Sequence, residues 1–205
     1  MSVHRCLRLP QPDRERKGKY SALDNAADWE YRYLMDQRFA IRELRRDDIP
    51  RLAGFPPPEW QFDAVRFLDL HAGFPYFHAI VAERGGALAG MANALLFGAS
   101  AWLGNIIVLP QHRRLGIGAA LTARLVETCS LRGCAHRLLI ATELGRPVYE
   151  SLGFRQSGEY LFLKPGRAVA PPDPGQLRAA VPGDLAAIAA LDRRATAEDR
   201  RAMLE

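Results

Sequence analysis

Hydrophobic residues recur with strand and helix periods through the middle of the chain, from Phe39 to Leu163. Alternating or continuous apolar runs predict strands, whereas apolar residues three or four positions apart predict helices. The predicted strands cover residues 39–44, 76–83, 87–97, 101–109, 137–141 and 154–163. The predicted helices cover residues 47–52, 60–71, 117–132 and 146–152. This order predicts the α/β (α+β) class, with a mixed central sheet that carries helices on its faces.

Two local features sharpen this prediction. Within residues 117–132, a row of apolar side chains at a spacing of four residues indicates one buried helix face: Ile117, Leu121, Leu125 and Cys129. Between the second and third predicted strands, Gly85-Gly86 is typical of a tight hairpin turn.

The regions outside this block lack its periodicity. Residues 1 to about 20 combine prolines with a charged run of mixed sign, which favours a solvated tail over a nucleic-acid-binding arm. A short docking helix is predicted over residues 22–36, after a capping box formed by Ser21 and Asp24. Proline and glycine dominate residues 165–176, which we expect to form a stiff linker.

Residues 177–205 repeat the pattern that opens the central block. At a constant offset (177 − 41 = 136), the matching pairs are Ile41 and Leu177, Arg42 and Arg178, Asp48 and Asp184, Ile49 and Leu185, Leu52 and Ile188, and Ala53 and Ala189. One interpretation is the beginning of a second, truncated copy; the other is a helical pair docked on the first domain. An incomplete copy would leave apolar residues to pack on the first domain or to drive self-association, and a homodimer is one outcome.

The predicted organisation therefore has four parts. Residues 1–36 form a tail with a docking helix, and residues 37–164 form the main domain. Residues 165–176 are the linker, and residues 177–205 begin the second copy.

Composition and charge limit the classes of protein that remain. The 205 residues are 48% hydrophobic and 25% charged, which is ordinary for a folded protein, and the net charge of +5 favours anionic ligands. Cys6, Cys129 and Cys134 lack CxxC spacing, so neither a disulfide framework nor a cysteine zinc site is expected. No signal peptide and no apolar run of membrane length are visible, so we expect a cytoplasmic protein without membrane or nucleic-acid partners.

The most informative segment runs from Ile106 to Gly118, where a strand leads through a basic turn into the best-defined helix. The free N–H groups of a helix N-terminus attract anions, and Gly116 and Gly118 would let the backbone approach a phosphate. The segment lacks the lysine of a P-loop and the third glycine of a dinucleotide fingerprint. The residues alone predict an anion-binding turn, and the alternative is a plain chain reversal with solvated Arg113 and Arg114.

Two motifs give the chain a family resemblance. Residues 108–118, V-x-P-x-x-R-R-x-G-I-G, resemble motif A of the GNAT N-acetyltransferase superfamily. Residues 145–154, GRPVYESLGF, resemble motif B of the same superfamily. The resemblance covers about residues 39–164, implies a mostly antiparallel central sheet flanked by helices, and extends to the tandem type with two such domains.

The resemblance implies acetyl-CoA as co-substrate and no metal. The cofactor-binding residues that it implies are Ile106, Ile107, Val108, Arg113, Arg114, Leu115, Gly116, Ile117, Gly118 and Ala119. Backbone N–H groups of the turn would hold the pyrophosphate, and the N–H of Val108 would polarise the thioester carbonyl. The acetyl group would pass directly to a primary amine, so Cys129 and Cys134 are expected to be ordinary buried thiols.

The resemblance also implies that Tyr149 is the general acid, while packing against Phe154 is the alternative reading of its position. An acceptor ammonium must lose a proton before it attacks. Glu143 is the first candidate for the general base and His78 the second, and a water relay without a dedicated residue is the third possibility. Thr142 and Gly145 stand where many relatives have asparagine and alanine.

The acceptor is not indicated beyond a small amine or a peptide. Phe55, Pro56–Pro58 and Trp60 lie where the family builds its acceptor wall. The prediction is therefore an acetyl-CoA-dependent N-acetyltransferase, and the alternative is a non-catalytic acyl-CoA-binding or scaffold domain of a tandem protein.

Overall fold

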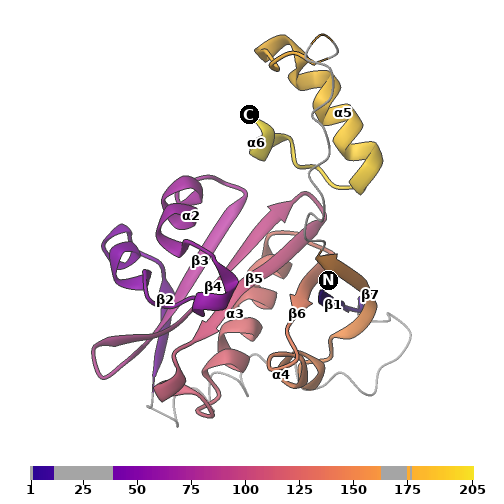
Figure 1. Ribbon diagram of the computed structural model, residues 1–205. Coiled ribbons are helices and arrows are strands. Elements are labelled where there is room, and N and C mark those ends of the chain that lie inside the picture. The colour runs from indigo at the N-terminus through magenta and orange to yellow at the C-terminus, as the bar shows by residue number, and fades with distance from the viewer. Residues whose placement is uncertain (1, 12–38, 163–174, 176) are drawn as a thin grey trace.

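The architecture is that of a computed structural model, which describes residues 2–11, 39–162, 175 and 177–205. Figure 1 shows a twisted central sheet with helices packed on it and a small helical unit beside one end of the sheet. The docking helix predicted over 22–36 and most of the linker predicted over 165–176 lie outside the described residues.

Seven strands form the sheet in the order β2-β3-β4-β5-β6-β1-β7. Their bounds are β1 Ser2–Leu9, β2 Ala40–Glu43, β3 Phe77–Arg84, β4 Ala87–Phe97, β5 Ser100–Val108, β6 His136–Ala141 and β7 Arg155–Phe162. All neighbouring pairs are antiparallel except β5 and β6, which run parallel. The predicted mixed, mostly antiparallel sheet is thus confirmed.

The N-terminus departs from the prediction. Residues 2–9 are not a solvated tail, because they form β1 and pair with β6 on one side and β7 on the other. Cys6, Leu7 and Leu9 are buried. A bulge between Cys6 and Leu7 places two consecutive side chains inside and breaks the alternation that marks a strand.

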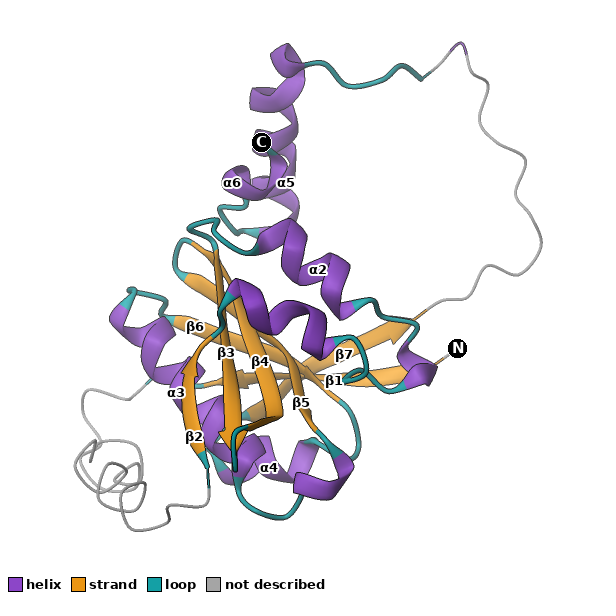
Figure 2. Cartoon of the chain, turned by 90° about the vertical axis from the view of Figure 1, so that its left-hand side faces the viewer, coloured by secondary structure: helices purple, strands orange, loops and turns teal. Residues whose placement is uncertain are grey.

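Helices cover both faces of the sheet (Figure 2). One face carries α3 (Ile117–Leu131) and α4 (Arg146–Ser151), and the other carries the 3₁₀ turns η1 (Arg46–Leu52) and η2 (Pro58–Trp60) with α2 (Ala64–His71). The predicted apolar row of α3 is fully covered, with all four of its residues at most 1% exposed. Each face of the sheet therefore has its own hydrophobic core.

The first predicted helix differs in kind from the α-helix expected. Residues 46–52 form a 3₁₀ helix that contains Pro50, whose ring in an α-helix would clash with the carbonyl of Arg46 four residues earlier. The predicted helix over 60–71 begins later, at Ala64, where the Asp63 side chain accepts the N–H of Arg66 at 3.0 Å and caps it.

The C-terminal unit contains the 3₁₀ turn η5 (Pro182–Asp184), α5 (Leu185–Thr196) and α6 (Arg201–Leu204). It meets the main domain where Trp102 Nε1 donates to Glu198 Oε1 at 2.5 Å. Leu185 and Ile188 are half-buried, whereas Leu191 is 60% exposed. None of the helices in the described part of the chain is long and apolar enough to cross a membrane.

Candidate active site

The site begins where two parallel strands part. β5 pairs with β6 only from Ser100 to Leu103, opposite His136 to Leu139. Beyond that point β5 continues to Val108 and stays paired with β4 on its other side, where Val108 lies opposite Gly90. Along the described strands, the β6-facing edge of residues 104–108 therefore has no ladder partner.

The backbone at this edge presents a donor. The N–H of Leu109 bonds to Ala89 O at 3.0 Å, towards β4. Successive N–H groups of an extended chain point to opposite sides, so the N–H of Val108 is directed to the β6 side, where the strands have parted. This is the orientation that the family resemblance requires of Val108.

A bulge in β5 accompanies the parting of the strands. The β4–β5 register shifts between Met91 and Asn93, and Asn105 adopts a left-handed backbone conformation with φ of 49°. The Asn105 side chain donates from Nδ2 to Oδ1 of Asn93 at 2.8 Å. Asn93 is only 2% exposed, so this hydrogen bond fixes the bulge from inside the protein.

The basic turn after β5 leads directly into the N-terminus of α3. Gly116 is the N-cap residue of α3, with φ of 80°, and Arg114 also has a positive φ of 61°. The first turn of α3 contains no acidic residue, so its free N–H groups keep their positive potential. Arg113 donates from Nε to the carbonyl of Val108 at 3.2 Å and ties the turn to the strand end.

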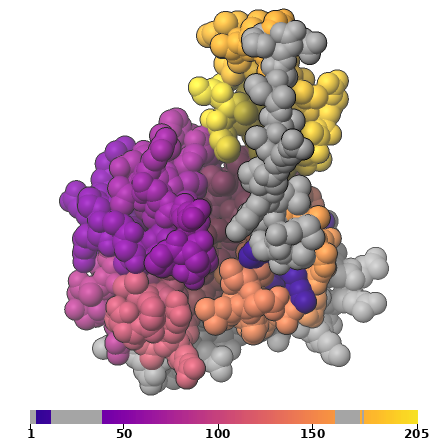
Figure 3. Space-filling view, in the orientation of Figure 1, coloured from indigo at the N-terminus to yellow at the C-terminus, as the bar shows by residue number. Residues whose placement is uncertain are grey.

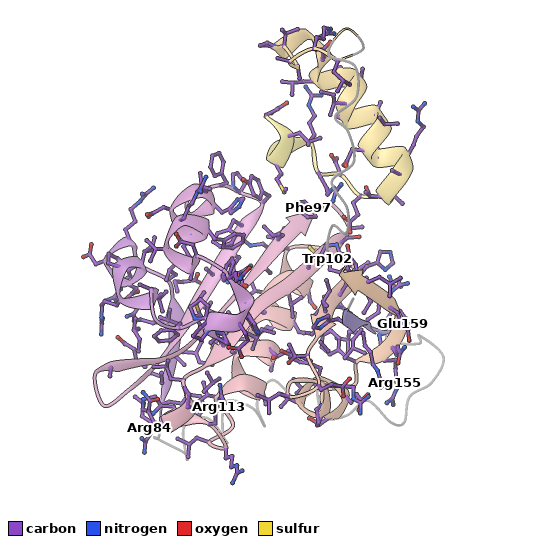
Figure 4. The ribbon with its side chains drawn as sticks, in the orientation of Figure 1. Arg84, Phe97, Trp102, Arg113, Arg155 and Glu159 are labelled. Atoms are coloured by element: carbon purple, nitrogen blue, oxygen red, sulfur yellow. The ribbon has the colours of Figure 1, made fainter. Side chains whose placement is uncertain are left out.

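Gly118 faces the same strand end. A Cβ added to Gly118 would lie 3.7 Å from Val108 Cγ2, an ordinary van der Waals contact, so a methyl group fits here and the glycine leaves that space beside Val108 unfilled. Figure 4 shows Arg113 at one end of the sheet together with Arg84, which ends β3. The structure therefore brings the ten predicted cofactor residues, 106–108 and 113–119, to one corner of the molecule that suits an anionic group.

α3 is held close to the sheet behind this corner. A Cβ on Gly90 would come 3.0 Å from the carbonyl oxygen of Ile107 and 3.2 Å from Ile117 Cγ2. Thr122 donates from its hydroxyl to Gly118 O at 2.7 Å within the first turns of the helix. A residue larger than glycine at position 90 would push α3 and its N-terminus away from Val108.

Tyr149 lies on α4 and belongs to the same core cluster, against which Val108 and Ile106 pack. Its ring makes an edge contact with Phe154, with 6.3 Å between ring centroids. Burial raises the pKa of the Tyr149 phenol to about 12, because the phenolate would lose its hydration. Tyr149 therefore packs against Phe154, and its hydroxyl is protonated at neutral pH.

The two candidate bases lie in different surroundings. Glu143 follows β6 with a side chain 76% exposed, 4.0 Å from Arg5 and 3.8 Å from Arg146. His78 is 7% exposed and lies on β3 opposite Ala94, which pairs with Leu103. That register aligns His78 with Leu103, where β5 and β6 are still paired. Leu103 is five residues before Val108 on β5.

His78 is also held in a structural setting. Burial lowers its pKa, and Nδ1 lies 3.5 Å from Glu43 Oε2. Its Nε2 is buried without a hydrogen-bond partner among the described residues. The geometry separates His78 from the corner that contains Val108.

The predicted acceptor wall is divided between core and surface. Phe55 is 8% exposed and belongs to the core on the η1–α2 face, while Trp60 is 41% exposed.

Burial raises the pKa of the Cys129 thiol to about 12, which agrees with an inert thiol. Within the described ranges, no cluster of histidine, cysteine and acidic side chains could hold a metal ion.

Sequence reasoning missed the Asn93–Asn105 pair. The partners are twelve residues apart on adjacent strands, and neither belongs to a recognisable motif. The only sequence signal was asparagine within an otherwise apolar strand, where a residue of low strand propensity indicates a bulge.

Comparison with known proteins identifies the family. The profile of the acetyltransferase (GNAT) family matches residues 39–154, which is more than half of the chain. The protein therefore belongs to the GNAT acetyltransferase family, and the resemblance of the two motifs is confirmed at that level.

Individual relatives are more distant. A Bacillus subtilis (strain 168) protein assigned as a ribosomal protein bS18-alanine N-acetyltransferase is 26% identical over 132 residues, covering 60% of this chain and 85% of its own length. The glucosamine 6-phosphate N-acetyltransferase of Trypanosoma brucei brucei is 39% identical over 51 residues, which are 25% of this chain and 35% of the relative.

The solved structure of a predicted acetyltransferase from Clostridium acetobutylicum with acetyl-CoA superposes with a TM-score of 0.52 at 22% identity. It covers 62% of this chain and 96% of that protein, and it supports the same fold.

Proposed function

We propose that the protein is an acetyl-CoA-dependent N-acetyltransferase that transfers the acetyl group directly to a primary amine. The observation that carries this proposal is the direction of the Val108 N–H. It points to the side of β5 where β6 no longer pairs with it, beside the N-terminus of α3. Acetyl-CoA supplies a thioester whose acetyl group a neutral amine can attack. A preorganised backbone donor stabilises the charge that develops on the carbonyl oxygen.

The anionic part of acetyl-CoA would be held by the turn after β5. The free N–H groups at the start of α3 and the exposed side chains of Arg113 and Arg114 supply positive potential there. Gly116 and Gly118 leave the backbone uncovered, so that a phosphate could approach it.

Tyr149 is the proposed general acid. A phenol is protonated at neutral pH and can donate a proton to a leaving thiolate once the sulfur carries charge. Burial, which raises the pKa of Tyr149 to about 12, makes it a weaker acid than a free phenol, so the donation must be driven by the basicity of the thiolate. Glu143 is the proposed acceptor of the amine proton, and its exposure would let it pass that proton on to solvent. The relatives act on a protein alanine and on an amino sugar, so the acceptor is proposed only as a primary amine.

The test is thiol release from acetyl-CoA with a panel of amines that includes peptide N-termini, amino sugars and small alkyl amines. We expect at least one amine to accelerate release, and Tyr149→Phe to lower kcat by about a hundredfold while acetyl-CoA still binds. Glu143→Gln should lower kcat more than Glu150→Gln, a control on a second exposed carboxylate beside Arg146. Binding without thiol release for any amine would instead support a non-catalytic acyl-CoA-binding domain.

A further inference from the structure

The C-terminal unit repeats more than the sequence of the main domain. At the offset of 136 residues, Arg178 and Asp184 correspond to Arg42 and Asp48. Arg42 donates from Nη1 to Asp48 Oδ2 at 2.6 Å and from Nη2 to Oδ1 at 2.9 Å. Arg178 donates to the same two oxygens of Asp184 at 2.6 and 2.7 Å. The forked ion pair is therefore the same, atom for atom.

The backbone around each pair repeats as well. Oδ2 of the aspartate accepts the N–H of the residue three positions earlier, Arg45 or Val181, at 2.9 Å in both places. Nη1 of the arginine also donates to the carbonyl of the residue after it, at 3.0 Å for Arg42 and 3.1 Å for Arg178. These shared bonds fix the same turn at the start of a helical segment. The turn follows β2 in the first copy and follows residues 177–180, which have no regular secondary structure, in the second.

The correspondence continues beyond the matched sequence. Gln61, with φ of 49°, ends η2, and Ala197, with φ of 58°, ends α5 at the equivalent position. Left-handed conformations are uncommon for residues other than glycine, and Gln61 and Ala197 are two of the four such residues in the described part of the chain. Their match at the same offset extends the structural repeat. Leu204, in α6, corresponds to Leu68, which is fully buried in α2.

The two copies differ in what covers them. In the first copy β3 pairs with β2. Glu83 on β3 accepts hydrogen bonds from Arg42, from Nη2 to Oε1 at 2.7 Å and from Nε to Oε2 at 3.0 Å, so Arg42 binds Glu83 as well as Asp48. Arg42 is accordingly 19% exposed, whereas Arg178 is 68% exposed and no described residue takes the place of Glu83. Figure 3 shows residues 177–205 protruding from the main domain.

We infer that residues 177–205 are a second copy of the unit that β2, η1, η2 and α2 form in the main domain. We further infer that the backbone of Leu177–Ala180 pairs with a β-strand, as β2 pairs with β3. The strand carries a carboxylate opposite Arg178 and small apolar side chains that cover α5. Charge complementarity supports this occupant, because the guanidinium of Arg42 holds two carboxylates and that of Arg178 holds one. The exposed Leu177 and Val181 flank the same edge.

This inference is independent of acetyl transfer, so its test measures folding. Residues 41–53 of the full chain are replaced by the sequence of residues 177–189, which brings the copy against the chain's own β3 and Glu83. The exchanged protein should unfold cooperatively, and replacing its transplanted arginine by alanine should lower Tm as much as Arg42→Ala does in the parent, within about 3 °C. Glu83→Gln should lower Tm in both backgrounds.

The matched control carries the same transplanted residues in scrambled order, and it should lose cooperative unfolding. Two results would overturn the inference. One is an exchanged protein that is no more stable than the scrambled control. The other is an exchanged protein in which neither the arginine replacement nor Glu83→Gln lowers Tm.

Discussion

The ring of Tyr149 lies over the α-carbon of Gly145. A Cβ built on Gly145 would come within 2.9 Å of Tyr149 Cε2 and 3.1 Å of its hydroxyl oxygen. Real side chains do not tolerate such a distance, so any residue larger than glycine must displace the tyrosine ring. The backbone of Gly145 is right-handed (φ −82°, ψ −27°), so the requirement for glycine comes from Tyr149 and not from backbone strain.

Gly145→Ala should therefore lower kcat by moving the Tyr149 hydroxyl, with little effect on the affinity for acetyl-CoA. The expected loss is about tenfold or more, and it should not add to the loss caused by Tyr149→Phe, because both changes remove the same group. Steady-state kinetics with the best amine of the panel measures this. Gly158→Ala, at a position with open space around it, is the control. Full additivity of the two substitutions would contradict the account.

The bulge in β5 gives a second prediction. Asn105→Val should weaken acetyl-CoA binding about tenfold, because a β-branched residue resists the left-handed conformation and cannot donate to Asn93. Asn105→Gly keeps the backbone conformation and should lose less. Calorimetric titration of both variants separates backbone from side-chain effects. Equal affinities for wild type and Asn105→Val would show that the bulge does not position the site.

Burial of Tyr149 gives a third prediction, for stability at alkaline pH. Its folded-state pKa of about 12 lies above the ordinary value of 10, so the folded protein holds this proton more tightly. The contribution to stability is complete below pH 10 and is lost as the pH rises from 10 to 12, by about 2–3 kcal/mol. Urea unfolding between pH 8 and about 11 should show a smaller decline for Tyr149→Phe than for wild type. Parallel declines would mean that the phenol is not buried in solution.

The sequence was most informative where pattern and structure share a local cause. β4, predicted over 87–97, has those same bounds, because a glycine turn and an apolar run define both ends. The helix over 117–132 was also predicted, since its apolar row is determined by the helical period alone. The turn between Arg113 and Ala119 followed from residues that are consecutive in the chain.

The features that the sequence did not reveal depend on distant partners. β1 pairs with strands more than a hundred residues away, and its bulge hides the alternation of its buried side chains. The point at which β5 and β6 part, after Leu103, is likewise a property of two strands and not of either one. The exposure of Glu143 and the remote position of His78 could be judged only once the register was known.

The corner between Val108 and the start of α3 is the proposed binding site of acetyl-CoA, and calorimetry measures that binding without depending on turnover. Gly118→Trp places an indole against Val108, whereas the control Gly183→Trp adds the same side chain in open space of the C-terminal unit. We predict micromolar binding by wild type and Gly183→Trp, and at least a hundredfold weaker binding by a folded Gly118→Trp. Equal binding by all three proteins, or none by folded wild type, would contradict the account.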